Sequence, residues 1–331
     1  MSTSESKSIS ILGLGQMGHA IASNFVSQGY KTFVWNRTPS KGADLVEQGA
    51  IQSPSSTECI RSSPLSILCV NTGDIVLDIL AAAGDVSGHT IVNIVNGSPQ
   101  EVRKTAEKSI SQYMATGYLH GSVMASPGLV RSGGAMTIFA GSSETFKKWE
   151  LTLQPLGITA WLLDDVGAAP LYDCSLLSIL SGIFSGFTQA LAMIGAAGHS
   201  ETEFTRGFVV PLLGQMEEWL VRTAEEVQNK EYVAEKNGSP IAVQLDSTKH
   251  IFETAKELGV SSRLLQGFLD IVKEGVERGQ GREEISGLVR LLQSVDPEVP
   301  SKAAQLKWPA LFKKKKKRTQ KDTPLSNCAV N

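Results

Sequence analysis

The chain reads Ile9-Ser10-Ile11-Leu12-Gly13-Leu14-Gly15-Gln16-Met17-Gly18 near its start, and this stretch decides the fold of its first half. It places the motif G-x-G-x-x-G between an apolar strand and an amphipathic helix. In a Rossmann fold, Gly13 would allow the tight turn, Gly15 would let a pyrophosphate approach the backbone, and Gly18 would let helix and strand pack closely. A glycine-rich turn without a ligand is the alternative. The stretch predicts a dinucleotide-binding loop made of Gly13, Leu14, Gly15, Gln16, Met17 and Gly18.

The end of the second predicted strand indicates which dinucleotide binds. It reads Val34-Trp35-Asn36-Arg37-Thr38, without the carboxylate that binds the ribose 2′-hydroxyl of NAD. The guanidinium of Arg37 can pair with a 2′-phosphate, and Asn36 and Thr38 can add neutral donors. Alternatively, Arg37 is a solvated residue of a turn. We expect NADPH as the cofactor, with Val70 and Asn71 contributing to its site.

Alternating short apolar runs and helical stretches predict βα units around a parallel sheet from Ser8 to about Leu163. We therefore expect an α/β Rossmann domain over residues 1–166. The predicted strands are Ile9–Leu12, Lys31–Trp35, Leu65–Val70, Thr90–Ile94, Tyr118–His120, Ala135–Ala140 and Trp161–Leu163.

After Gly167 the pattern becomes helical, which predicts an all-α domain over residues 167–296 that begins with a long interdomain helix. Apolar side chains cover much of the predicted helix Leu176–Ile194, so we expect helices of its own domain or of a second subunit to bury it. Further predicted helices are Phe204–Asn229, Ile241–Leu258, Ser261–Glu277 and Arg282–Val295.

The composition is that of a globular protein without a bulk electrostatic partner. Of 331 residues, 41% are hydrophobic and 19% charged, and a net charge of -2 gives no general attraction to nucleic acid. The polar start lacks the pattern of a secretory signal, no unbroken apolar run reaches the length of a membrane span, and the four cysteines are scattered. The five histidines have no ligand spacing, so we expect no metal site. We expect a cytoplasmic protein.

The last segment, 297–331, is polar and is expected to be a disordered basic tail. It contains the run Lys313–Arg318 and ends Cys328-Ala329-Val330-Asn331, which has the form of a prenylation box with an unusual last residue. A tail without function, a nuclear localisation signal and a lipid anchor at Cys328 are the alternatives. We expect no membrane association unless Cys328 is prenylated.

The sequence before the tail resembles the β-hydroxyacid dehydrogenase superfamily, which is 6-phosphogluconate dehydrogenase-like and NADP-binding. Within this superfamily it resembles the imine reductase and reductive aminase branch. The resemblance spans Ser8 to about Val295. It rests on the glycine loop together with Trp35-Asn36-Arg37-Thr38, Thr90–Pro99, His120–Pro127, Leu177-Ser178 and Phe184–Phe187. It implies an oxidoreductase that reduces C=N bonds with NADPH.

The predicted interdomain helix begins with the most informative departure from the wider superfamily. Hydroxyacid dehydrogenases have a lysine where this chain has Asp173, and an asparagine where it has Leu177. A carboxyl group suits stabilisation of an iminium cation or protonation of an amine nitrogen, and the resemblance implies that role for Asp173. Alternatively, Asp173 only stabilises a helix N-terminus. Pro170 fits the first turn of this helix.

Other candidate site residues are spread over both predicted domains. Asn96 follows a strand at the carboxyl edge of the sheet and can hold the nicotinamide ribose or substrate, although an asparagine before glycine is also a turn residue. The resemblance implies a tyrosine and a tryptophan in the amine pocket where this chain has Ser181 and Met216, and it implies a pocket role for Gln244. We expect the substrate to contact Met124, Tyr172, Ser181, Met216 and Gln244.

We therefore expect hydride transfer to a C=N carbon, with Asp173 and Asn96 as catalytic residues. The substrate is an imine, or a carbonyl compound plus an amine. The resemblance also implies a homodimer with exchanged helical domains. Two alternatives stay open: an NADPH-dependent 3-hydroxyacid dehydrogenase or aldehyde reductase, and a catalytically idle NADPH-binding sensor.

Overall fold

The computed structural model describes residues 7–234 and 238–293. It consists of a first unit that ends at Leu176 and a second unit that begins at Leu177. Each unit is described by itself, and the basic tail with Cys328 lies outside the described residues.

The first unit is built on one eight-stranded sheet in the order β3-β2-β1-β4-β5-β6-β7-β8. All neighbours are parallel except β6 and β7. The chain leaves β1 toward β2 on one side and later returns to β4 on the other, so the carboxyl ends of β1 and β4 form a topological switch point. The strands are β1 (Ser8–Leu12), β2 (Lys31–Trp35), β3 (Ile51–Gln52), β4 (Leu65–Leu68), β5 (Thr90–Asn93), β6 (Gly117–Val123), β7 (Met136–Gly141) and β8 (Ile158–Trp161).

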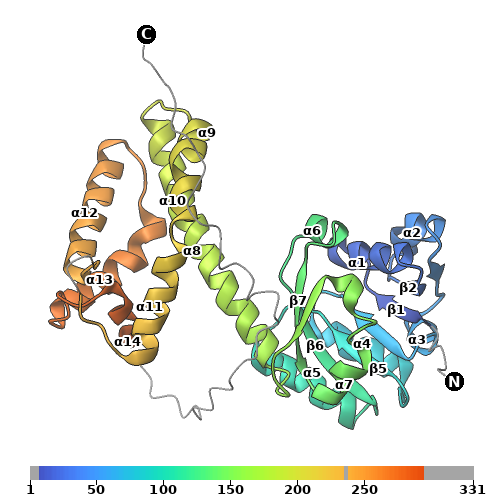
Figure 1. The fold of residues 1–331 in the computed structure, drawn as a ribbon. Coiled ribbons are helices and arrows are strands. Elements are labelled where there is room, and N and C mark those ends of the chain that lie inside the picture. Colours follow the sequence, from blue (N-terminus) through green and yellow to red (C-terminus); the bar gives the residue numbers. More distant parts are fainter. Residues whose placement is uncertain (1–6, 235–237, 294–331) are drawn as a thin grey trace, which may run out of the picture. The chain divides into compact units, whose positions relative to one another are not determined.

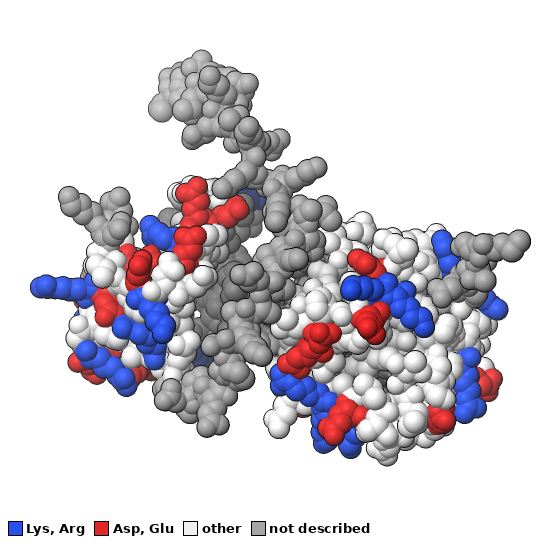
Figure 2. All heavy atoms as spheres, turned by 60° about the horizontal axis from the view of Figure 1, so that its bottom comes forward, with Lys and Arg blue, Asp and Glu red and all other residues white. Residues whose placement is uncertain are grey.

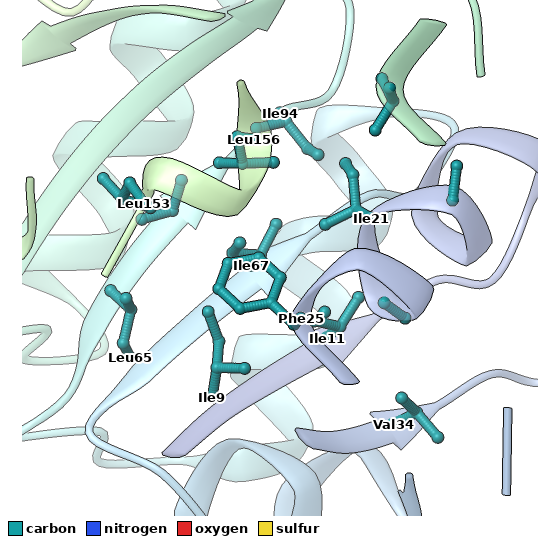
Figure 3. Close-up of a cluster of buried hydrophobic side chains, with 14 of the residues drawn as sticks. Ile9, Ile11, Ile21, Phe25, Val34, Leu65, Ile67, Ile94, Leu153 and Leu156 are labelled. Atoms are coloured by element: carbon teal, nitrogen blue, oxygen red, sulfur yellow. The ribbon is translucent and has the colours of Figure 1, made fainter. Parts of the chain in front are cut away.

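Helices cover both faces of this sheet (Figure 1). Side chains of α1, α2, α6 and α7 pack on one face, and those of α3, α4 and α5 pack on the other. Figure 3 shows the first of these cores, in which Phe25 of α1 lies over Ile11 and Ile67 of the central strands. The helices are α1 (Gln16–Ser27), α2 (Ala43–Glu47), α3 (Ser56–Arg61), α4 (Gly73–Ala83), α5 (Pro99–Ser111), α6 (Pro127–Arg131) and α7 (Ser143–Trp149).

The predicted α/β Rossmann domain and its strand series are confirmed, apart from shifts of one or two residues at strand ends, such as the end of β4 at Leu68 instead of Val70, and three larger differences. The two-residue strand β3 was missed, because it exists through its pairing with Phe33 and Val34 and has no pattern of its own. Strand β6 extends to Val123 because its last residues, Gly121 to Val123, pair with the antiparallel strand β7. The last strand was placed too late: β8 starts at Ile158, directly after a glycine with a positive φ of 99°.

The second unit is helical, as predicted, and begins within the long helix α8 (Ala168–Ala196), whose first residues belong to the first unit. Its core is small and is formed by Ile241, Leu245, Val272 and Leu288. The remaining helices are α9 (Glu201–Phe204), α10 (Val210–Gly214), α11 (Glu217–Asn229), α12 (Ile241–Glu257), α13 (Gln266–Glu277) and α14 (Val289–Leu292).

Two predicted helices of the second unit were wrong as continuous elements. The segment Phe204–Asn229 is divided by a π-helical turn over Thr205–Val209 and by a break at Gln215. Pro211 has no N–H to give to the preceding turn, and Gly214 ends α10 next to the break. In the described part of the segment Arg282–Val295, which ends at Gln293, a 3₁₀ turn, Ile285–Leu288, precedes the short helix α14.

Helix α8 is apolar and exposed. Its side chains Leu176, Leu177, Ile179 and Leu180 are exposed, and Phe184 is 62% exposed. Burial by helices of its own domain, the first alternative, is therefore wrong for residues 176–184, whereas residues 185–195 are mostly half-buried. By length and composition α8 could also cross a membrane, which the search for unbroken apolar runs did not predict. Exposed apolar surface of this kind is typical of sites that contact another protein or a membrane.

Charged side chains do not segregate by sign on the face seen in Figure 2, where basic and acidic groups alternate over both units.

Candidate active site

The glycine loop joins β1 to α1 in a geometry that requires glycine at two of its three positions. Gly13 has a positive φ of 96°, and an added Cβ there would lie 2.3 Å from the carbonyl oxygen of Cys69. At Gly18 an added Cβ would lie 1.9 Å from the carbonyl oxygen of Gly13, so helix and strand approach too closely for a side chain. At Gly15 it would meet open space. Two glycines thus shape the loop, and the third leaves room above it.

The N-terminus of α1 is open to an external acceptor. Gly15 caps the helix without a side chain, and the first helical hydrogen bond runs from His19 N to Gly15 O at 2.9 Å. The N–H groups of Gln16, Met17 and Gly18 therefore lack helical acceptors. By contrast, serine or threonine side chains cap α3, α4, α5, α6 and α7. The uncapped N-terminus after the glycine turn fits a pyrophosphate.

The loop after β2 lies beside the glycine loop. The Oδ1 of Asn36 accepts from Leu14 N at 2.9 Å, and its Nδ2 donates to Thr38 O at 3.1 Å. The Asn36 amide thus ties the two loops together, a role that the sequence analysis missed because it links residues 22 positions apart. One N–H of this amide remains for a ligand.

Arg37 and Thr38 are exposed at the end of this loop. Within the described residues no carboxylate forms an ion pair with Arg37, which leaves its guanidinium available to an anion. Lys41, in the following 3₁₀ turn, is a second exposed cation that the sequence analysis did not single out. A basic residue four positions after Arg37 was the available signal. These groups fit a 2′-phosphate.

The next strands end in further polar groups at the same edge of the sheet. Val70 and Asn71 follow β4, and Asn96 follows β5 with an exposed side chain. Asn96 lines a hollow of about 270 Å³ between the first turns of α4 and α5. Ser98 and Glu101 form a reciprocal cap at the start of α5, which holds the backbone just after Asn96. The hollow provides space for a polar ligand at this edge of the sheet.

Asp173 lies in the second turn of α8 and is half-buried. Burial raises the pKa of its carboxyl group above the ordinary value. Its carboxylate makes no hydrogen bond or ion pair within the described part of the chain. Because the helix begins at Ala168 and dipole effects fade beyond the first turn, dipole stabilisation explains this residue poorly. Pro170 lies in the first turn, where its missing N–H costs nothing.

Two other titratable groups lie on β6, near the carboxyl edge. Burial lowers the pKa of His120 to about 4, so its imidazole is neutral at physiological pH. Burial raises the pKa of Tyr118, whose hydroxyl accepts a hydrogen bond from Asn93 at 2.8 Å. Neither group is poised to exchange protons near neutral pH.

The residues predicted to contact substrate are divided between the units. Met124 and Tyr172 are half-buried and pack against the same small cluster around Ile138 and Ala169 of the first unit. Ser181, Met216 and Gln244 belong to the second unit, on α8, before α11 and on α12. Ser181 donates to its own helix at Leu177 O, and Gln244 donates to Ser239. Within each unit, therefore, only Met124 and Tyr172 are brought together.

Two protein families match this chain in succession. Residues 8–162 match the NAD binding domain of 6-phosphogluconate dehydrogenase, and residues 165–294 match the NADPH-dependent reductive aminase-like C-terminal domain. An NADPH-dependent reductive aminase of Aspergillus oryzae is 35% identical over 288 residues, which cover 86% of this chain and 96% of that protein.

Solved structures give the same result. A reductive aminase of Aspergillus terreus in complex with NADPH and ethyl levulinate superposes with a TM-score of 0.81 at 34% identity, covering 86% of this chain and 99% of that chain. An imine reductase of the same organism, in complex with NADPH4 and dibenz[c,e]azepine, has a TM-score of 0.79 at 35% identity, covering 87% and 100%.

Proposed function

Because this chain belongs to the family of NADPH-dependent reductive aminases and imine reductases, we propose that it reduces C=N bonds with NADPH. The observation that carries this proposal is Asp173, a half-buried carboxyl group without a partner in the described chain. It occupies the position at which hydroxyacid dehydrogenases have a lysine. A carboxyl group matches a basic or cationic nitrogen, whereas a lysine matches an oxygen.

The residues of the first unit fit NADPH. The open helix N-terminus and the space at Gly15 accommodate the pyrophosphate, and Arg37, with the remaining N–H of Asn36 and with Thr38, holds the 2′-phosphate. We assign Val70, Asn71 and Asn96 to the ribose and nicotinamide end, since they follow strands at the carboxyl edge. When bound, NADPH supplies the hydride that reduces the substrate carbon.

The protein residues orient the substrate and manage its charge. Asp173 stabilises the cationic nitrogen or gives it a proton, and Asn96 holds the substrate or ribose by hydrogen bonds. Met124 and Tyr172 contribute apolar surface that excludes water, which hydrolyses imines. Ser181, Met216 and Gln244 would line the amine pocket. The small Ser181 and flexible Met216 indicate a pocket that differs in shape from those with a tyrosine and a tryptophan.

We further propose that the protein is a homodimer with exchanged helical domains. The exposed apolar surface of α8 supports this assembly, because covering it with a second copy removes that surface from water. We keep the division into a cofactor domain at 1–166, a helical domain at 167–296 and a tail at 297–331. The matched ranges 8–162 and 165–294 support the first boundary.

NADPH consumption with a panel of cyclic imines tests the proposal. We expect turnover by the wild-type protein and a loss of about 100-fold or more in kcat for Asp173→Ala, with NADPH affinity unchanged. A matched control is Asp246→Ala, which removes an exposed carboxylate from α12. Oxidation of 3-hydroxyacids without imine turnover would instead indicate the dehydrogenase, and NADPH binding without turnover would indicate the idle sensor.

The pH profile of kcat distinguishes the two roles of Asp173. If the carboxyl group donates a proton, kcat falls as pH rises through its pKa. If the carboxylate stabilises a cation, kcat falls as pH drops through the same pKa. Burial raises this pKa above the ordinary value, so in either case the limb lies above the range of an exposed aspartate. Asp173→Asn is expected to remove that limb.

A further inference from the structure

Arg103 and Asp165 form a bidentate ion pair, with two hydrogen bonds, just before the start of α8. The Nε of Arg103 donates to Oδ1 of Asp165 at 2.9 Å, and its Nη2 donates to Oδ2 at 2.6 Å. Arg103 lies in the second turn of α5, and Asp165 lies in the connection between β8 and α8. Parallel hydrogen bonds between guanidinium and carboxylate restrict orientation as well as distance.

Gly167 completes this arrangement. Its backbone N–H donates to Oδ1 of Asp165 at 3.0 Å, so one carboxylate oxygen joins Arg103 to the residue directly before α8. An added Cβ at Gly167 would lie 2.6 Å from both Cζ and Nη2 of Arg103. The guanidinium therefore lies directly against the glycine, and any other residue at position 167 would displace it.

The arrangement determines where α8 starts. Ala168 and Ala169 are buried against the small cluster of the first unit, and Leu171 N donates to Gly167 O in the first turn. Asp173 follows in the second turn of the same helix. At the other end of the ion pair, α5 starts three residues after Asn96, where the reciprocal cap of Ser98 and Glu101 holds the backbone. Helix α5 thus connects the loop of Asn96 to the helix of Asp173.

We infer that Arg103, Asp165 and Gly167 are positioning residues that hold Asp173 in register with Asn96 for C=N reduction. The inference rests on the proposed role of Asp173. The ion pair contributes little to overall stability, because the side chains of Arg103 and Asp165 are 52% and 48% exposed. Its effect is on geometry, and hydride transfer is sensitive to displacements of about 1 Å.

Arg103→Lys tests the inference, because lysine keeps the charge but loses the two-point geometry. The matched control is Arg278→Lys on α13, where Arg278 and Glu274 form an equally short ion pair of 2.6 Å that is far in sequence from the site. For Arg103→Lys we expect kcat to fall about 10-fold or more, with NADPH affinity and melting temperature close to wild type. The control should retain wild-type kcat.

Two further measurements separate positioning from a merely structural role. Hydrogen–deuterium exchange of the cofactor-free protein should be faster over residues 166–176 in Arg103→Lys, and unchanged in the glycine loop. The primary isotope effect on kcat, measured with NADPH deuterated at the transferred position, should increase, because hydride transfer becomes more rate-limiting. Gly167→Ala should reproduce both effects without changing any charge.

The outcomes are distinct. Wild-type kcat and exchange in both Arg103→Lys and Gly167→Ala would overturn the inference, and so would a fall in kcat that only follows a loss of folded protein. If Asp173→Ala is inactive while both positioning variants are fully active, the inference alone fails. If Asp173→Ala keeps full activity, the proposed role of Asp173 fails, and the inference fails with it.

Discussion

The first unit encloses a large buried apolar core, whereas the second has a small core and leaves many of its apolar side chains exposed. Strand residues such as Ile9, Ile11 and Leu65 are inaccessible between two layers of helices. In the second unit the buried cluster is small, and Phe208 is 71% exposed. The first unit is therefore a complete fold that carries the features expected of a cofactor site. The second has exposed apolar surface of the kind that is typical of interaction sites.

This difference indicates how the two units would contribute to one activity. Binding a dinucleotide needs a rigid turn, an open helix end and a cation, and the first unit has all three. Selecting a substrate needs a pocket, and the residues expected to line it in the second unit lie on helices with large exposed surfaces. The predictions below test this separation.

The glycine loop should show the largest effect. Gly18→Ala forces a Cβ against the carbonyl of Gly13, and we expect a loss of about 3 kcal/mol in the free energy of unfolding together with loss of NADPH binding. Gly15→Ala meets open space, so stability should be unchanged while NADPH affinity falls about 10- to 100-fold. Thermal melts and titration calorimetry measure the two quantities. Equal stability loss in both variants would contradict the distinct roles of these glycines.

A charge on α8 should cause the next largest effect. Phe184→Glu places a carboxylate on the exposed apolar surface, and we expect the dimer to be weakened by about 2 kcal/mol or more. Analytical ultracentrifugation over a dilution series measures the dissociation. Glu253→Gln, a change elsewhere in the second unit, serves as the control. A dimer that survives Phe184→Glu unchanged would show that this surface has another partner.

Arg37 should affect the choice of cofactor and little else. Arg37→Ala removes charge-assisted hydrogen bonds to the 2′-phosphate, so we expect the preference for NADPH over NADH to fall about 10- to 30-fold, which corresponds to about 1.5–2 kcal/mol. NADH affinity itself should change little. Titration with both cofactors tests this, with Arg278→Ala as the control. If the preference for NADPH is unchanged, Lys41 or Thr38 binds the 2′-phosphate in place of Arg37.

The smallest expected effect is that of Asp173→Asn on the free energy of unfolding. Burial raises the pKa of this carboxyl group, so the folded protein binds its proton more tightly than the unfolded chain does. Ionisation therefore reduces stability as pH rises through the unfolded and then the folded pKa. Asp173→Asn should raise the free energy of unfolding at pH 7 by about 0.5 kcal/mol, and the gain should vanish at low pH. Denaturant titrations at pH 3 and pH 7 measure it.

Much of the first unit could be read from local patterns. The motif Gly13–Gly18 and the β-branched runs predicted the βα units, since the close approach at Gly18 and the positive φ at Gly13 exclude other residues. The candidate phosphate residue Arg37 could be located in the same way, because it directly follows a strand. In contrast, β3 was missed because a two-residue strand depends on its neighbour. The break at Gln215 was missed because helical periodicity continues across it.

The amino-acid sequence alone thus determined the Rossmann fold, the glycine loop and the helical character of the second half, because each has a motif or a spacing of apolar residues that is visible over a short stretch of chain. Only the tertiary structure revealed that the Asn36 amide joins two loops, that α8 stays exposed, and that Arg103 holds Asp165 across 62 positions. Contacts between distant residues have no period or motif, since they arise only when the sheet brings its loops to one edge.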